Sequence, residues 1–287
     1  MIPGSFAYHR PKTVQEAITL LADLGEDARP LAGGHSLVPM MKLRLATPSN
    51  LVDLGGIGDL RGIRADGGDI VIGAMTTQHE IIASDLLAAK VPILRETASQ
   101  IADPQVRYVG TIGGNAANGD PGNDMPAVLI TLGATYHLTG KAGERRVAAR
   151  DFYQGVYLTA LKPGEVLTAI RIPVPPAGHG SAYVKLKRKI GDYATAAAAV
   201  VLTMKAGKVG SCAVGLTNVA DRPLLAEEAG RILTGSTLDA ATVKRAVAAA
   251  EAITSPAADG HGPSAYRTKM AGVMLARAIA RAASRAG

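Results

Sequence analysis

The chain has 287 residues, 47% of them hydrophobic, which is enough for a buried core and for two or three domains. Its formal net charge is +7, but the basic residues are dispersed, and no Trp and two Phe leave few side chains to stack on bases. A nucleic-acid-binding protein is therefore a remote alternative. One cysteine excludes an internal disulfide and an iron-sulfur cluster held by this chain alone. The sequence lacks an 18-residue apolar run and a signal-peptide pattern, which predicts a cytoplasmic protein.

The first 55 residues combine helix and strand around a pair of glycines. Thr13-Val14-Gln15-Glu16 is a capping box, and apolar residues at helical spacing follow it as far as Gly25, which predicts a helix. A strand over 28–31 then leads into Ala32-Gly33-Gly34-His35-Ser36. Beyond this loop we expect a helix over 37–45 and a strand over 51–54.

From residue 56 the pattern changes to short strands and turns. Asp66-Gly67-Gly68 predicts a hairpin between residues 63 and 72, and a second pair of glycines follows in Thr111-Ile112-Gly113-Gly114-Asn115. Prolines in 173–178 mark a linker, because proline cannot join a sheet ladder and stiffens a connection. The other elements expected here are helices over 77–83, 92–101 and 125–132, the last capped by the turn cluster 119–124, and a strand over 166–172.

After the linker, strand patterns precede helix patterns. The expected strands are 182–189, 194–204 and 209–216, and the expected helices are 224–233, 239–253 and 266–283. This order indicates a small α+β domain, a three-stranded antiparallel sheet with helices on one face. Arg277, Arg281 and Arg285 form one stripe on the last helix. We interpret this stripe as a solvated face, with a partner-protein contact as the second interpretation.

The two glycine pairs form the candidate ligand site. Gly-Gly removes side chains where backbone N–H groups must approach a ligand, and Ser36, Thr111 and Asn115 offer short polar groups for phosphate oxygens. A glycine pair serves more often as a simple turn. Two pairs, each with hydroxyl or amide neighbours and each before a helical pattern, favour one diphosphate of a dinucleotide gripped from both sides.

Motifs for other chemistry are missing. Gly56-Ile57-Gly58-Asp59-Leu60-Arg61 begins like a dinucleotide-binding fingerprint but has Arg61 in place of the third glycine. A Walker A sequence and a nucleophile elbow are absent, and the six histidines lack metal-ligand spacing. The sequence therefore predicts neither a hydrolase site nor a metal site in this chain.

Four segments together resemble the FAD-binding medium subunits of the molybdenum hydroxylases. These segments are 32–37, 111–115, 120–126 and 185–194. The resemblance covers essentially the whole chain and is greatest for the carbon-monoxide-oxidising branch of the family. It implies an α+β chain with a vanillyl-alcohol-oxidase/PCMH-type FAD-binding fold. Two α/β subdomains, 1–55 and 56–176, would hold FAD between them, followed by a small C-terminal α+β lid domain, 177–287.

The resemblance also implies individual FAD-binding residues. The diphosphate loops fall on Ala32, Gly33, Gly34, His35 and Ser36 and on Thr111, Ile112, Gly113, Gly114 and Asn115. A carboxylate after the second loop falls on Asp124, a lysine near the flavin on Lys185 with Lys187 as its competitor, and a lid residue near the isoalloxazine on Tyr193. Ile101 and Leu161 match apolar positions of the flavin pocket. The alternatives are that Asp124 is a helix cap, Lys185 a surface charge and Tyr193 a core aromatic.

His35 allows two interpretations. Its Gly-Gly-His-Ser context also resembles the berberine-bridge-type oxidases, in which the histidine of this loop is bonded covalently to the flavin. The chain has no motif for a substrate-side base or a second cofactor, which favours an electron relay. We therefore predict non-covalent FAD, with His35 forming hydrogen bonds in the loop and phosphate region.

The implied function is electron transfer within an oxidoreductase. A large partner subunit would oxidise carbon monoxide with water at a molybdenum-copper centre. A small subunit would pass the electrons through iron-sulfur clusters to the FAD of this chain, and from there they would reach a quinone or related respiratory acceptor. The expected assembly is a dimer of heterotrimers in the cytoplasm, with peripheral attachment to the inner face of the membrane as a further expectation. The alternative is the FAD subunit of a molybdenum hydroxylase that acts on an aromatic heterocycle or an aldehyde.

Overall fold

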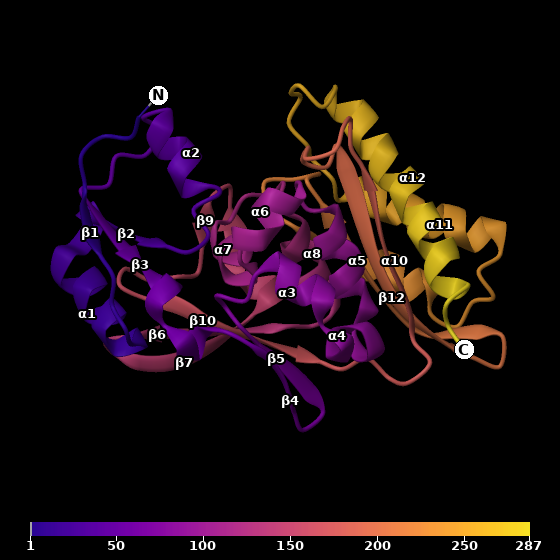
Figure 1. The fold of residues 1–287 in the computed structure, drawn as a ribbon. Coiled ribbons are helices and arrows are strands. Elements are labelled where there is room, and N and C mark those ends of the chain that lie inside the picture. Colours follow the sequence, from indigo (N-terminus) through magenta and orange to yellow (C-terminus); the bar gives the residue numbers. More distant parts are fainter. Residues whose placement is uncertain (1) are drawn as a thin grey trace.

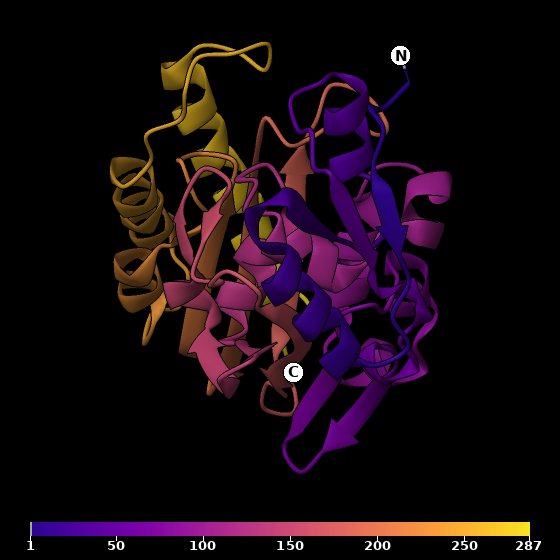
Figure 2. The same ribbon diagram turned by 90° about the vertical axis from the view of Figure 1, so that its left-hand side faces the viewer.

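A computed structural model describes residues 2–287, which form three successive regions, each built on its own sheet (Figure 1). The N-terminal region and the C-terminal helices lie on opposite sides of the molecule, with the helices of the middle region between them. In the view turned by 90° the N-terminal region faces the viewer, and the C-terminal helices lie to its left (Figure 2). No helix within residues 2–287 is long and apolar enough to cross a membrane.

The N-terminal sheet is parallel, with β1 (Ala7–His9), β3 (Asn50–Asp53) and β2 (Ala28–Leu31) in that order. Helix α1 (Val14–Leu24) packs against β2 and β3. The helix begins where the capping box predicts, since the Thr13 hydroxyl accepts a hydrogen bond from the Glu16 N–H at 3.1 Å. Helix α2 (Leu37–Lys42) is shorter than the predicted 37–45, because Arg44 takes a positive φ of 61° that ends it.

The middle sheet is antiparallel and carries the largest core. Its strands are β4 (Ile63–Asp66), β5 (Asp69–Gly73), β10 (Val166–Pro173), β6 (Thr135–Gly140) and β7 (Gly143–Ala148), in that spatial order. The helices of this region are α3 (Gln78–Ala83), α4 (Asp85–Lys90), α5 (Pro92–Gln100), α6 (Pro104–Val109), α7 (Ile112–Ala117), α8 (Asp124–Thr131) and α9 (Ala149–Phe152). A small hairpin, β8 (Tyr153–Gly155) with β9 (Leu158–Thr159), completes it. The predicted hairpin, the three helices and the strand are confirmed to within a few residues.

The alanine-rich run 196–199 lies on a strand of the C-terminal sheet that is buried on both faces. Strands β11 (Gly180–Leu186), β12 (Ala196–Lys205) and β13 (Lys208–Thr217) are antiparallel neighbours. Ala197 and Ala199 of β12 belong to the middle core, while Ala196 and Ala198 pack in the C-terminal core with α12 (Ser264–Ala283). Both faces of β12 are therefore buried, and only small side chains allow layers to approach from both sides. Helices α10 (Glu227–Leu233) and α11 (Ala240–Ala252) complete this region.

Two details of the C-terminal region differ from the sequence predictions. The three long strands are joined by a fourth, β14 (Leu224–Leu225), which pairs with β13, so the helix expected from 224 begins at Glu227. The arginine stripe is not simply a solvated face. Arg281 and Arg285 both form ion pairs with Glu96 of α5, at 3.2 and 2.7 Å, and so join the last helix to the middle region.

Candidate cofactor site

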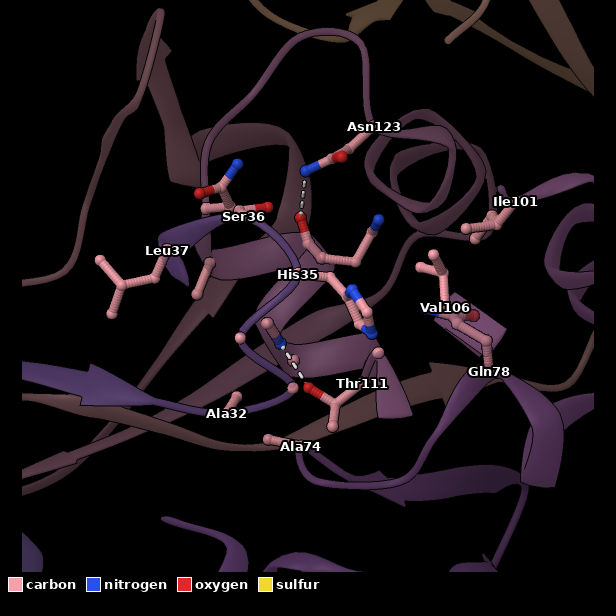
Figure 3. A pocket seen from close by; sticks show the side chains of 18 of the residues that line it. Ala32, His35, Ser36, Leu37, Ala74, Gln78, Ile101, Val106, Thr111 and Asn123 are labelled. Atoms are coloured by element: carbon pink, nitrogen blue, oxygen red, sulfur yellow. Dashed lines mark hydrogen bonds between the residues drawn. The ribbon is translucent and has the colours of Figure 1, made fainter. Parts of the chain in front are cut away.

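A cavity of about 590 Å³ lies where the three regions meet. Every predicted site residue except Ile112 lines it, including the two glycine segments, Ile101, Asp124, Leu161, Lys185 and Tyr193. Ile112 is fully buried in the middle core instead. Figure 3 shows the first loop (Ala32, His35, Ser36 and Leu37) on one side of this cavity, with Ile101, Val106 and Gln78 on the other.

The loop 32–36 presents free backbone donors to the cavity. The N–H groups of Gly33, Gly34, His35 and Ser36 donate to no acceptor within residues 2–287. Gly34 has a φ of +71°, which glycine adopts readily. A Cβ on Gly33 would lie 2.4 Å from the Val109 carbonyl oxygen, so this glycine lets the loop approach the backbone at 109–110. The loop is therefore suited to an anion, and Gly33 is required by packing within the chain.

The second glycine pair lies inside the first turn of α7 rather than in a loop before a helix. The N–H groups of Ile112 and Gly113 donate to the Thr76 and Ala74 carbonyl oxygens, at 2.9 and 2.8 Å. The Gly114 N–H donates to the Thr111 hydroxyl at 3.0 Å. These backbone donors are already used by the protein, so they are not available to a phosphate. What this segment offers is the O–H of Thr111 and the side chain of Asn115, whose Oδ1 is buried without a hydrogen-bond partner in residues 2–287.

Asp124 and Lys185 form a buried ion pair in the cavity wall. Asp124 Oδ2 lies 2.8 Å from Lys185 Nζ, and the two side chains are 4% and 1% exposed. The Tyr183 hydroxyl donates to the other oxygen, Oδ1, at 2.5 Å. Burial raises the pKa of the Asp124 carboxyl, while Lys185 and Tyr183 oppose that shift. Asp124 is thus more than a helix cap, and Lys185 is not a surface charge.

The two competing lysines have different surroundings. Both Nζ atoms lie 3.4 Å from the Gln100 carbonyl oxygen, but Lys187 does not line the cavity. Burial and the neighbouring Lys185 lower the pKa of Lys187. Lys185 is the lysine that faces the cavity. Tyr183, which shares the partner Asp124 with Lys185, was missed in the sequence, although the spacing of two residues on one strand places both side chains on the same face.

Tyr193 stands at the cavity rim and is 44% exposed, so it is not a core aromatic. The segment that carries it is held by Arg188, which pairs with Asp192 at 2.8 Å and donates to the Gly260 carbonyl oxygen at 2.8 Å. Beside Tyr193 the Tyr157 hydroxyl donates to Asp120 at 3.1 Å. The partly exposed ring of Tyr193 therefore lines the cavity from the C-terminal part of the chain.

His35 in the first loop and Ala102 in the apolar wall are two further residues of the cavity. The His35 ring forms no hydrogen bond with any residue in 2–287 and is exposed, so the hydrogen bonds predicted for it within the loop are not present. Beside Ile101, Ala102 has a φ of +44°, and Arg107 donates to the carbonyl oxygens of both residues, at 2.9 and 3.3 Å. Arg107 thus fixes a strained bend in the apolar wall.

Comparisons with known proteins agree with this geometry. Residues 4–175 match the FAD binding domain in molybdopterin dehydrogenase, and residues 181–282 match the CO dehydrogenase flavoprotein C-terminal domain. The two matches together span nearly the whole chain and divide it at the proline-rich linker. The chain therefore belongs to the FAD-binding subunits of the molybdopterin dehydrogenases, the molybdenum hydroxylase family.

Comparisons with individual proteins of this family are more specific. The chain is 71% identical over 286 residues to the carbon monoxide dehydrogenase medium chain of Afipia carboxidovorans, covering 100% of this chain and 99% of that one. It matches a chain of the reconstituted CO dehydrogenase from Oligotropha carboxidovorans over the full length of both, with a TM-score of 0.99 and 71% identity. A chain of quinoline 2-oxidoreductase from Pseudomonas putida 86 matches over 99% of both chains, with a TM-score of 0.94 and 37% identity.

Proposed function

We propose that this chain is the FAD-binding, electron-transferring subunit of an aerobic carbon monoxide dehydrogenase. The observation that carries the choice of enzyme is the 71% identity over the whole chain to a carbon monoxide dehydrogenase medium chain. The relative that acts on an aromatic heterocycle shares the fold but only 37% of the residues. The substrate site would lie on another subunit, so this chain contributes no residue to the oxidation of carbon monoxide.

Unpaired polar groups in the cavity wall fit FAD. The free N–H groups of residues 33–36 are donors for a diphosphate, and a diphosphate supplies only acceptors. Buried Asn115 Oδ1 needs a donor, which the hydroxyls of a dinucleotide provide. The Ile101 and Leu161 side chains add apolar surface for a ring. A basic nucleic-acid surface would require none of these groups.

Each part of the wall has a proposed task. The loop 32–36 holds the diphosphate with backbone donors, and the Thr111 O–H and Asn115 amide bind from the opposite side. The Asp124–Lys185 pair presents a directed dipole without a net charge, and Tyr193 covers the mouth of the cavity. FAD would lie between subdomains 1–55 and 56–176, with 177–287 as a lid. When bound, the flavin supplies a centre that takes up electrons and passes them on singly or in pairs.

The partners follow from the same proposal. The molybdenum-copper centre and the iron-sulfur clusters belong to a large and a small partner subunit, in a dimer of heterotrimers. A quinone or related respiratory acceptor takes the electrons from this chain. The complex works in the cytoplasm, peripherally attached at the inner face of the membrane.

Purification of the chain with its partner subunits tests the function. The complex is expected to contain stoichiometric FAD and to reduce a dye with carbon monoxide, whereas the chain alone does not reduce it. Dye reduction with quinoline or an aldehyde but not with carbon monoxide would assign the chain to another molybdenum hydroxylase. A complex without FAD would refute the proposal as a whole.

A further inference from the structure

Gln78 is a polar residue of the cavity that has no task in the site described above. It is the first residue of α3, only 2% exposed, and it lines the cavity. Neither Nε2 nor Oε1 of its side chain has a hydrogen-bond partner within residues 2–287. In Figure 3 Gln78 lies on the same side of the cavity as Val106 and Ile101.

The backbone of Gln78 is held firmly, unlike its side-chain amide. Its N–H donates to the Gly110 carbonyl oxygen at 2.9 Å, next to the second glycine segment. The preceding Thr77 forms a reciprocal capping box with Glu80, with hydrogen bonds of 2.7 and 3.2 Å. A fixed backbone with an unpaired buried amide is the arrangement of a preformed contact for a ligand.

The amide places a donor next to an acceptor. Buried polar groups in native structures are nearly always paired, and an apolar residue of similar length would fill the same space without leaving two unpaired atoms. The complementary ligand group also carries an acceptor beside a donor. The adenine ring of FAD has such an edge, and so does the pyrimidine part of the flavin.

We propose that Gln78 is an FAD-binding residue whose side-chain amide donates to and accepts from one heteroaromatic edge of the cofactor. This inference rests on the proposed FAD-binding function. It adds a specific polar contact from α3, an element that contributes none of the residues implied by the family resemblance.

Replacement by a side chain of the same length tests the proposal. Gln78→Met removes both polar atoms and keeps the apolar stem. We expect about tenfold weaker FAD binding, the effect of losing one to two hydrogen bonds. In the FAD-free protein the midpoint of unfolding should stay the same or rise, because two unpaired buried atoms are gone. A merely structural role for Gln78 would instead lower that midpoint.

The measurements use the full-length chain as isolated, with any subunits that co-purify, after removal and titration of FAD. Gln15→Met, at an exposed position on α1, is the matched control and should change neither quantity. If the wild type binds FAD and Gln78→Met binds it equally well, the inference is wrong while the proposed function stands. If the wild type binds no FAD, both fail.

Titration with ADP assigns the half of the cofactor that Gln78 contacts. If Gln78→Met weakens ADP binding as much as FAD binding, the contact is to the adenine half. If ADP binding is unchanged while FAD binding is weakened, the contact is to the flavin half.

Discussion

Asp124 and Lys185 form an ion pair across the boundary between the two parts of the chain that match different family domains. Asp124 begins α8 in the FAD-binding part, and Lys185 lies on β11 of the C-terminal part. The 2.8 Å contact is almost completely shielded from water. It forms one wall of the cavity, so the seating of the C-terminal domain and the shape of the cofactor site depend on the same two side chains.

Removal of Lys185 alone should destabilise the chain strongly. Lys185→Met leaves the Asp124 carboxylate buried without its cation, at a cost of about 3 kcal/mol near neutral pH. The double variant Lys185→Met/Asp124→Asn should recover most of that loss, because no buried charge remains unpaired. Denaturant unfolding of the single and double variants measures both values. A double variant as unstable as Lys185→Met would contradict the buried pair.

The same variant should show an altered pH dependence of stability. Burial already raises the pKa of Asp124 above its ordinary value of 3.8, and Lys185 opposes this shift. A carboxyl with a higher pKa in the folded state contributes stability at low pH that is lost as the pH rises. Lys185→Met raises that pKa further. Its stability relative to the wild type should therefore fall as the pH rises from the raised pKa of Asp124 in the wild type to its higher pKa in the variant, and a pH-independent difference would contradict this account.

The Tyr183 hydroxyl should matter for FAD binding as well as for stability. Tyr183→Phe leaves Asp124 Oδ1 without its 2.5 Å donor and should cost about 1 to 2 kcal/mol. Loss of this donor also loosens the Asp124–Lys185 wall, so FAD binding should weaken severalfold. Tyr153→Phe is the control, because it breaks a buried 2.7 Å hydrogen bond to Tyr136 away from the cavity. It should lower stability similarly and leave FAD affinity unchanged.

Gly114 should not tolerate a larger side chain. A Cβ at this position would lie 2.9 Å from the Thr111 hydroxyl oxygen and 3.4 Å from the Ala32 Cβ, so Gly114→Val would push apart the two segments that face the diphosphate. The purified variant should lose its FAD. Gly58→Val, at a position with open space around the added atoms, should retain it. A folded Gly114→Val protein with full flavin content would argue against the site.

His35 should not be bonded to the flavin. The exposed His35 ring is free in the first loop, and a covalent bond would serve an oxidase that attacks its own substrate rather than a relay. Acid precipitation should therefore release the yellow chromophore into the supernatant. Colour that stays in the pellet, on a peptide containing His35, would instead favour a free-standing oxidase.

The sequence predicted elements well where local signals were strong. The capping box before α1 and the Asp66-Gly67-Gly68 turn depend only on residues that are close together in the sequence. Both are present in the structure. Helices α4 and α6, six residues each, were missed. They are too short to show a helical period, and they lack the capping box that precedes α3, which is equally short. Most of the site residues that were predicted from the family motifs line the cavity. Gln78 and Tyr183 were missed, because only the packing of distant segments makes one unpaired and the other a partner of Asp124.

The most direct test of the account is the absorbance of the flavin when carbon monoxide is added without oxygen. In the complex with the partner subunits, the account predicts that carbon monoxide bleaches the flavin and that an added acceptor restores its colour. The FAD-loaded chain alone should show no bleaching, because the proposal places the oxidation of carbon monoxide on the large subunit. A flavin that stays oxidised in the active complex, or one that is bleached in the isolated chain, would contradict the proposed division of labour.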